Sequence, residues 1–376
     1  MAAGLLLFSQ SAFASDVEAE LRQMQDRIAQ LEGQLESGTA PLQERESGSG
    51  LGALIENTDI NGWAAASYNY NFEGFENSAG TANNRPTSHG TSNSFQIDQA
   101  WISIDNPADE NGRAGAHLDL TAGAAHGGGA GIALYEASIS YLAPIGDGIM
   151  VEGGIMPTLI GAEVDRTNAN FNVTRGIVWD LQPTLNTGAR LSTNLTDEVS
   201  VTLGVLNDQA TRDLLGDTDN EKAIAGQVAW AGEDCGASFN FSWGDNRGDV
   251  NRFIGDVVLT YDGMEDVSMW FDYTVVSDDD GVAEGETHGI AAAARLALAD
   301  DMGVAVRGEA VIVDNDALET ETYSLTVTGD KSLTDHLTAK AEVRLDFDAD
   351  DGLPDDKGAA GEDVAALILA QLIYEF

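Results

Sequence analysis

Charged side chains recur on one face of several alternating segments of this sequence, opposite apolar neighbours. Thirteen such positions stand out, and both signs of charge occur among them. Basic groups held opposite carboxylates in a confined aqueous space create a transverse field that orders water and sorts solutes by charge. The same groups could instead pair with one another and fill a closed interior. The positions, which we expect to line a pore, are Arg113, Asp119, Glu136, Glu152, Arg190, Asp256, Asp272, Arg295, Arg307, Glu309, Lys340, Glu342 and Arg344.

Other reactive residue types form no recognisable constellation. The five histidines show no metal-ligand spacing, and no Gly-x-Ser-x-Gly elbow is present. Cys235 is the single cysteine, which excludes an intrachain disulfide and a cysteine metal cluster. The run from Asp346 to Gly352 begins like a calcium loop, but Lys357 stands where a bidentate glutamate belongs, so a solvated acidic loop is favoured. We expect no enzyme, no metal and no cofactor.

The charged positions lie on segments with a period of two, which is typical of β-strands. Between Leu337 and Phe347, apolar residues alternate strictly with polar and charged ones. The same alternation predicts that Tyr135 points to the opposite face from Glu136. The stretch Val364–Phe376 is also alternating, and its ending Tyr-x-Phe looks like the terminal assembly signal of outer-membrane β-barrels.

The connections between these segments alternate between short and long. Asp262–Asp266 is one of the short ones, and Asn315–Glu319 is grouped with the long ones. The count is about 16 strands if Trp179–Leu195 is mostly one strand, and an even number brings both ends of a membrane barrel to the same side. The predicted fold is therefore all-β, a transmembrane antiparallel β-barrel over residues 58–376. A soluble sandwich shows the same period, so alternation alone does not decide.

The charge balance narrows the partners. The chain has 63 acidic and 18 basic residues, a net charge of −45, and such a surface repels nucleic acid. The acidic excess is compatible with a saline habitat or with a pore whose field favours cations. No run of apolar residues is long enough for a membrane-spanning helix, and a barrel does not need one.

The long connection Leu159–Arg175 is too rich in apolar and Asn residues for a freely solvated loop. Folded inward, it would narrow a pore. Packed over the rim, it would only cover the barrel's end, and both arrangements fit the sequence. Its charged residues, which we expect at a constriction, are Glu163, Asp165, Arg166 and Arg175.

The N-terminal part differs in composition from the rest. Residues 1–14 read as a signal peptide, with the small-x-small site Ala12-Phe13-Ala14, and residues 38–57 as a flexible linker. Between them, residues 15–37 predict a short helix with a heptad seam, which we expect to form a trimeric coiled coil in the periplasm. An amphipathic helix lying on or plugging its own barrel is the alternative. The seam residues are Val17, Leu21, Met24, Ile28, Leu31 and Leu35.

Three stretches carry a family resemblance. Gly154–Glu163, the Asn-rich Asn168–Arg175 and the Thr-Gly-Ala-Arg strand within Pro183–Arg190 are similar to the OmpL-like family of β-barrel porins. The resemblance implies an outer-membrane diffusion channel for ions and small hydrophilic solutes, and the acidic balance predicts a preference for cations. We expect outer-membrane lipid around the barrel and a homotrimer. In the alternative, the barrel anchors the coiled coil, which tethers the outer membrane to peptidoglycan.

Overall fold

The fold was obtained as a computed structural model. It divides into two units, residues 1–57 and residues 58–376. It describes residues 58–72, 93–110, 112–124, 131–209, 221–246, 251–279, 284–315, 318–348, 353–354, 360–362 and 364–376. The predicted signal peptide, coiled coil and linker lie outside these residues. No helix in the described part is long and apolar enough to span a bilayer.

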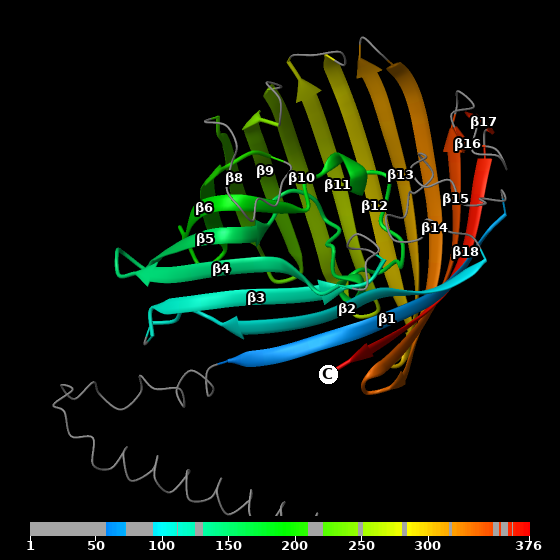
Figure 1. Ribbon diagram of the computed structural model, residues 1–376, viewed down its shortest axis with the longest axis horizontal. Helices are drawn as coiled ribbons and strands as arrows, with labels where there is room; N and C mark the ends of the chain where they lie inside the picture. The colour runs from blue at the N-terminus through cyan, green and yellow to red at the C-terminus, as the bar shows by residue number, and fades with distance from the viewer. Residues whose placement is uncertain are drawn as a thin grey trace, which may run out of the picture. The chain divides into compact units, whose positions relative to one another are not determined.

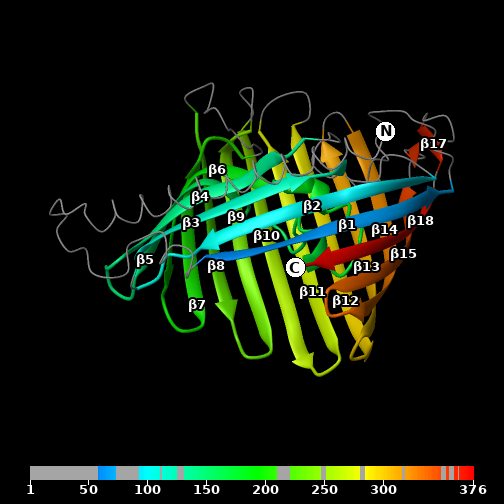
Figure 2. The same cartoon turned by 60° about the horizontal axis from the view of Figure 1, so that its bottom comes forward.

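Sixteen strands form one closed antiparallel barrel in which neighbours in sequence are neighbours in space, as predicted (Figure 1). β1 pairs with both β2 and β18, which closes the sheet (Figure 2). A separate two-stranded sheet joins β16 (Leu353–Pro354) and β17 (Ala360–Glu362). The barrel strands are β1 (Asp59–Asn71), β2 (Ser94–Asn106), β3 (Ala114–Ala122), β4 (Ala133–Ala143), β5 (Ile149–Pro157), β6 (Leu185–Asn194), β7 (Val199–Leu206), β8 (Ala223–Ala231), β9 (Cys235–Asp245), β10 (Asn251–Met264), β11 (Val267–Asp278), β12 (Gly285–Ala299), β13 (Met302–Asn315), β14 (Leu318–Thr334), β15 (Leu337–Asp348) and β18 (Val364–Glu375).

The two faces of the barrel wall have opposite chemistry. Along β14, Thr326 and Thr328 are fully buried, while Leu325 and Val327 are exposed. β18 repeats the pattern, since Gln371 is buried and Leu372 exposed. A soluble sandwich buries its apolar face, whereas a membrane barrel turns that face to lipid and keeps the polar face inside. The observed burial therefore decides for the membrane barrel.

Two expected boundaries were wrong. Trp179–Leu181 forms a short 3-10 helix (η3), so the strand expected over Trp179–Leu195 begins only at Leu185, after Pro183. Proline has no N–H for a ladder, which explains why the strand starts beyond it. The connection expected to be long at Asn315–Glu319 leaves only residues 316 and 317 between β13 and β14. Neither change alters the strand count.

Tyr135 lies inside the barrel, not on the outer face as its alternation predicted. The register between β3 and β4 slips here, because Leu118 pairs with Ala137 and Leu120 with Leu134, so that Asp119 faces both Tyr135 and Glu136. Such a β-bulge can turn two successive side chains to one face. Tyr135 then packs edge-on against Trp101, with ring centroids 4.7 Å apart.

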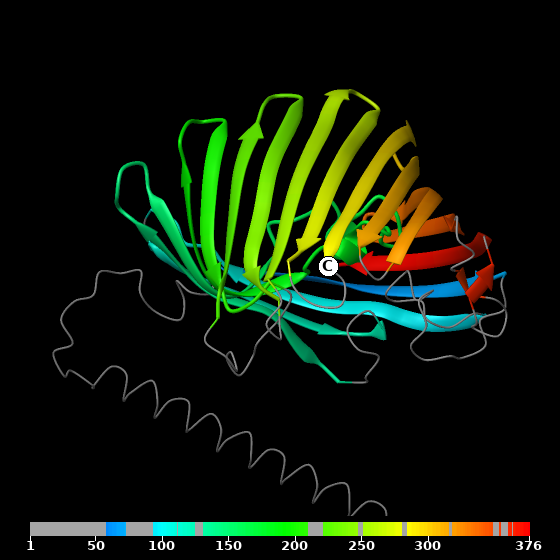
Figure 3. The same ribbon diagram turned by 90° about the horizontal axis from the view of Figure 1, so that it is seen from above.

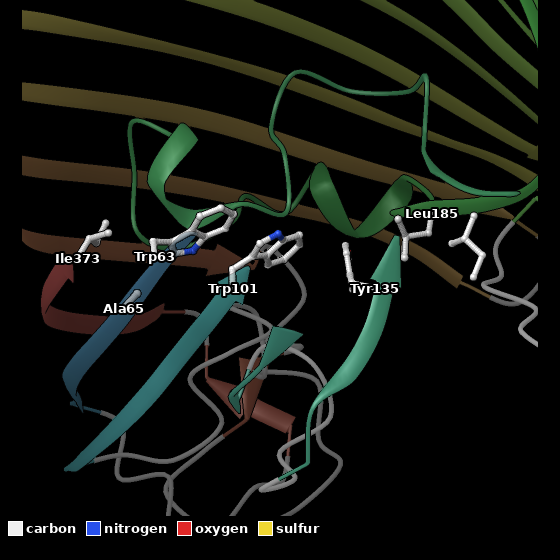
Figure 4. Packing of buried hydrophobic residues seen from close by; sticks show 7 residues of the cluster. Trp63, Ala65, Trp101, Tyr135, Leu185 and Ile373 are labelled. Atoms are coloured by element: carbon white, nitrogen blue, oxygen red, sulfur yellow. The ribbon is translucent and has the colours of Figure 1, made fainter. Parts of the chain in front are cut away.

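The largest buried apolar cluster continues this contact along the inner wall. Trp101 stacks on Trp63 of β1, with ring centroids 4.9 Å apart and planes 15° apart. Ile373 of β18 and Leu185 of β6 belong to the same cluster (Figure 4). The Trp63 indole Nε1 donates to Gln99 Oε1 at 3.1 Å, so its polar edge is satisfied. Trp101 of this cluster lies within 5.6 Å of the Arg166 guanidinium, which belongs to the segment described next.

The apolar outer face of the barrel predicts how charged substitutions change its stability in a bilayer. Val327 lies in an exposed apolar run on β14 between Glu321 and Lys331, near the expected centre of the bilayer. We expect Val327→Arg to lower the free energy of unfolding from vesicles by about 2–4 kcal/mol. Leu333→Arg, next to the turn, should lower it by only about 0–1 kcal/mol. Urea titration in phospholipid vesicles measures both values. Equal costs at the two positions would contradict the assigned bilayer centre.

Candidate functional site

The chain between β5 and β6, residues 158–184, runs inside the barrel instead of over its rim (Figure 3). We call this stretch the inner segment. It contains two short 3-10 helices, η2 (Thr167–Ala169) and η3. It makes hydrogen bonds to β2, β3, β11, β13, β14, β15 and β18. Strands from opposite sides of a closed wall share contacts with one segment only if that segment crosses the interior.

Apolar side chains of the inner segment pack on the inner wall. Ile177 and Val178 are 2% exposed and contact Ala291 of β12 and Val311 of β13. Ile160 forms a second cluster with Ile254 of β10 and Val276 of β11. Small or branched residues at these wall positions replace the polar ones found elsewhere inside. Burial of these apolar side chains stabilises the inner segment inside the barrel, although it is a connection between two strands.

Wall carboxylates accept hydrogen bonds from the backbone of the inner segment. Glu342 of β15, 2% exposed, accepts from the Val173 N–H at 2.6 Å and the Thr174 N–H at 3.1 Å. Asp272 of β11 accepts from the Ala162 N–H at 2.8 Å, and Glu309 of β13 from the Val178 N–H at 3.3 Å. A buried N–H must find a partner, and a charged acceptor is the stronger kind.

Wall cations bind the carbonyls of the same segment. Lys340 Nζ donates to Asn170 O at 2.7 Å, and Arg344 Nη1 donates to Arg175 O at 2.6 Å. Arg307, which is fully buried, donates to Thr174 O at 2.6 Å. β13 and β15 thus present alternating charges to a stretch of bare backbone.

Arg307 also forms one ion pair with the inner segment and a second one within the wall. Its Nη1 lies 2.6 Å from Glu163 Oε1 and its Nε lies 2.9 Å from Glu309 Oε2. The other Glu163 oxygen accepts from the Gly176 N–H at 2.6 Å. A Cβ at Gly176 would overlap the Glu309 carboxylate, so a larger residue there would displace this fully buried side chain.

The opposite edge of the inner segment is held through Arg166. Its Nη2 lies 2.7 Å from Asp119 Oδ2 on β3 and 3.6 Å from Glu136 Oε2 on β4. The guanidinium also lies 5.6 Å from the centre of the Trp101 ring, within range of a cation–π contact. Nearby, Gln99 Nε2 donates to Asp165 O at 2.7 Å. Polar side chains of β2 and β3, beside the apolar cluster that contains Trp101, therefore also hold the inner segment.

Arg175 folds back onto the inner segment itself. It donates to Val164 O and Asp165 O, both at 2.7 Å, and its guanidinium lies 5.9 Å from the centre of the Trp179 ring. Burial lowers the pKa of the Arg175 guanidinium from its ordinary value, because the charge loses its water. Its role in the fold is to bridge the two ends of the bend over residues 164–175.

Four of the expected positions, Glu152, Arg190, Arg295 and Arg113, do not contact the inner segment in the described hydrogen bonds and ion pairs. Glu152 and Arg190 pair on neighbouring strands at 2.7 Å, and Arg295 pairs with Asp330 at 2.6 Å. Asp256, by contrast, accepts from Asn240 and Thr274 within the wall and also from the Gly161 backbone of the inner segment. Arg113 lies just before β3 in a short connection, where its Nη1 donates to Leu142 O at 3.2 Å.

Uncharged residues also hold the inner segment, and the charge pattern of the sequence did not indicate them. Gln99 accepts from the Thr167 N–H at 3.0 Å, and Asn172 Nδ2 donates to Thr328 Oγ1 at 2.7 Å. Gln182 Nε2 donates to Asp272 at 3.0 Å. The available signal was their place on the polar face of an alternating strand or in an Asn-rich loop.

Comparison with known proteins agrees with this architecture. A family model described as "Putative beta-barrel porin-2, OmpL-like" matches residues 57–376. No curated protein matches the sequence. Among solved structures, the Vibrio cholerae outer-membrane protein OmpT has a TM-score of 0.57 at 10% identity, covering 85% of this chain and 97% of that one. An anion-selective porin from Comamonas acidovorans has a TM-score of 0.57 at 13% identity, covering 85% and 99%. At such identities the likeness concerns the fold.

The hold of the wall on the inner segment can be measured at Glu342. Glu342→Gln replaces a charged acceptor of two buried N–H groups with a neutral amide, which costs about 1.5–3 kcal/mol. We expect the Val173 and Thr174 amides to exchange hydrogen about tenfold to hundredfold faster, because local opening becomes easier. Glu319→Gln, at an exposed end of β14, is the control and should leave exchange unchanged. Unaltered exchange in Glu342→Gln would show that this carboxylate does not hold the segment.

Proposed function

The chain belongs to the OmpL-like family of β-barrel porins, and from that membership we propose an outer-membrane channel through which ions and small hydrophilic solutes diffuse passively. The observation that carries this proposal is the inner segment, which crosses a polar interior and is held there on two sides. About 16 strands enclose enough room for an aqueous path beside such a segment. The segment then sets the width of the path.

We assign the lining of this path to the wall charges that the inner segment leaves in contact with solvent. The Glu152 and Arg190 side chains of the wall are 21% and 18% exposed, and Arg166 of the inner segment itself is 36% exposed. Arg307, Glu309, Lys340, Glu342 and Arg344, by contrast, are buried against the inner segment. Their proposed role is to fix the constriction rather than to meet the solute.

The balance of buried charge supports a preference for cations. Within the described part of the chain, ten carboxylates are buried against four basic side chains. Field lines inside a low-dielectric wall are focused into the aqueous path, so a net negative wall concentrates cations there. The Comamonas structure with the same fold is described as anion-selective, which means that the fold leaves the sign of selectivity to the side chains.

A homotrimer is the proposed assembly. A trimer form of Vibrio cholerae OmpT has a TM-score of 0.60 to this chain at 10% identity. The heptad seam of residues 15–37 would add a second contact between three copies, too short to be stable alone. The mass of the protein in detergent, with and without Asp16–Ser37, tests this proposal. A monomer in both cases would reject it.

Recording in planar lipid bilayers tests the channel itself. We expect stable conductance steps from the purified, folded protein, and a reversal potential across a KCl gradient with the sign of cation preference. Absence of conductance from folded protein would reject the open channel. Conductance with anion preference would keep the channel and reject the selectivity.

Substitutions of the pair on β5 and β6 test which charges the solute meets. We expect Arg190→Gln to increase cation preference and Glu152→Gln to decrease it, because each removes one charge of known sign from the path. Glu233→Gln, in an exposed turn between β8 and β9, is the matched control. The measurement is the reversal potential of each variant. Shifts of the same sign in both variants would contradict the assignment.

A further inference from the structure

Three groups that commonly bind metal ions converge on the inner wall beside the anchor of Arg166. His117 and Asp119 are two residues apart on β3, so both point inward, and the bulge in β4 turns Glu136 toward them. His117 Nε2 lies 3.2 Å from Asp119 Oδ1 and 3.5 Å from Glu136 Oε2. The three ligand atoms lie within 4.8 Å of one another.

A neighbouring carboxylate orients the imidazole. His117 Nδ1 lies 3.0 Å from Asp105 Oδ1 on β2. An Nδ1–H that donates to this carboxylate leaves the lone pair of Nε2 facing Asp119 and Glu136. Histidines that bind metal ions are usually oriented by a carboxylate in this way, which fixes the tautomer and raises the basicity of the ligand nitrogen.

The cluster holds an imidazole nitrogen directly against a buried carboxylate oxygen. Asp119 is fully buried, and its Oδ1 lies 3.2 Å from His117 Nε2, with which it forms an ion pair. The second oxygen of Asp119 is used by Arg166. A cation between His117 Nε2 and Asp119 Oδ1 would take the place of the imidazole proton that otherwise joins these atoms.

Two of the three separations between the ligand atoms match those around a zinc ion. Zinc binds nitrogen and carboxylate oxygen at about 2.0–2.2 Å, which puts tetrahedral ligands about 3.3–3.6 Å apart. The observed separations of 3.2 and 3.5 Å lie at this edge length. Calcium and magnesium prefer six or more oxygen ligands, and an imidazole nitrogen disfavours them.

The local charge also suits a divalent cation. Asp105, Asp119 and Glu136 bring three negative charges, and Arg166 returns one positive charge. Zinc would displace the proton of His117, and the carboxylates around it then outnumber the single Arg166 guanidinium. The His117 side chain is 20% exposed, which leaves a way in from the interior.

We propose that His117, Asp119 and Glu136 form a binding site for a divalent transition-metal ion of the zinc class, with Asp105 as the orienting carboxylate and the fourth ligand position facing the barrel interior. The site would lie next to the point where Arg166 ties the inner segment to β3. This inference does not depend on the proposed channel function, because binding to the folded barrel can be measured without conduction.

Metal uptake by the full chain, folded in detergent, tests the proposal. Titration with ZnCl2 in the presence of excess MgCl2 should reveal one strong site per chain, and CoCl2 should give the visible absorption of a tetrahedral centre. His117→Asn and Asp119→Asn should abolish this site. Asp105→Asn should weaken it by about tenfold to hundredfold, as losses of orienting carboxylates do. His336→Asn, in an exposed turn, should bind as the unaltered protein does.

Several outcomes would overturn the site. One is the absence of a strong zinc site in protein whose folding is verified by its electrophoretic shift on heating. Another is a site that survives both His117→Asn and Asp119→Asn, which would place the ion elsewhere. A third is loss of binding in His336→Asn to the same extent, which would reveal surface binding only. In each case the conductance measurement remains a separate test of the channel.

Discussion

The structure depends on one constraint: inside a bilayer, no water is present to bind the N–H and C=O groups of a strand. Only a sheet without free edges satisfies all of them. Here the first and last strands complete the sheet, and Gly62 and Phe376 exchange backbone hydrogen bonds of 3.1 and 3.0 Å. Closure separates an inside from an outside. The period of two then assigns apolar side chains to lipid and polar ones to the interior.

The enclosed polar wall in turn makes a place for the inner segment. A stretch with little regular secondary structure leaves many backbone groups unpaired, and such a stretch is stable inside only where side chains replace the missing ladder. Glu342, Lys340 and Arg344 on β15, with Arg307 and Glu309 on β13, supply these partners. Several of the charges that suggest ion selection in the sequence thus hold the inner segment in place. In the proposed channel, selection would fall to the charges that remain in contact with solvent.

Periodicity made the barrel, its strand count and the inward direction of most charged positions predictable. It failed at the bulge of β4, because a register slip depends on the partner strand and leaves Tyr135 looking like an outward residue. The sequence left open whether the loop folds inward, since that is decided by contacts with strands more than a hundred residues away, such as Val173 with Glu342. The sequence did not indicate the cluster around His117, because Asp105 and Glu136 lie on other strands. Spacing along one chain does not reveal such proximity.

The central claim is that the inner segment crosses the interior and is held against β14 and β15. A cross-link measures this most directly. Asn172 and Thr328 touch at 2.7 Å, so Asn172→Cys with Thr328→Cys, in a Cys235→Ser background, should form a disulfide on mild oxidation of the folded protein. The single-cysteine proteins should show no such bond. Failure of the pair to cross-link in a correctly folded barrel would contradict the account.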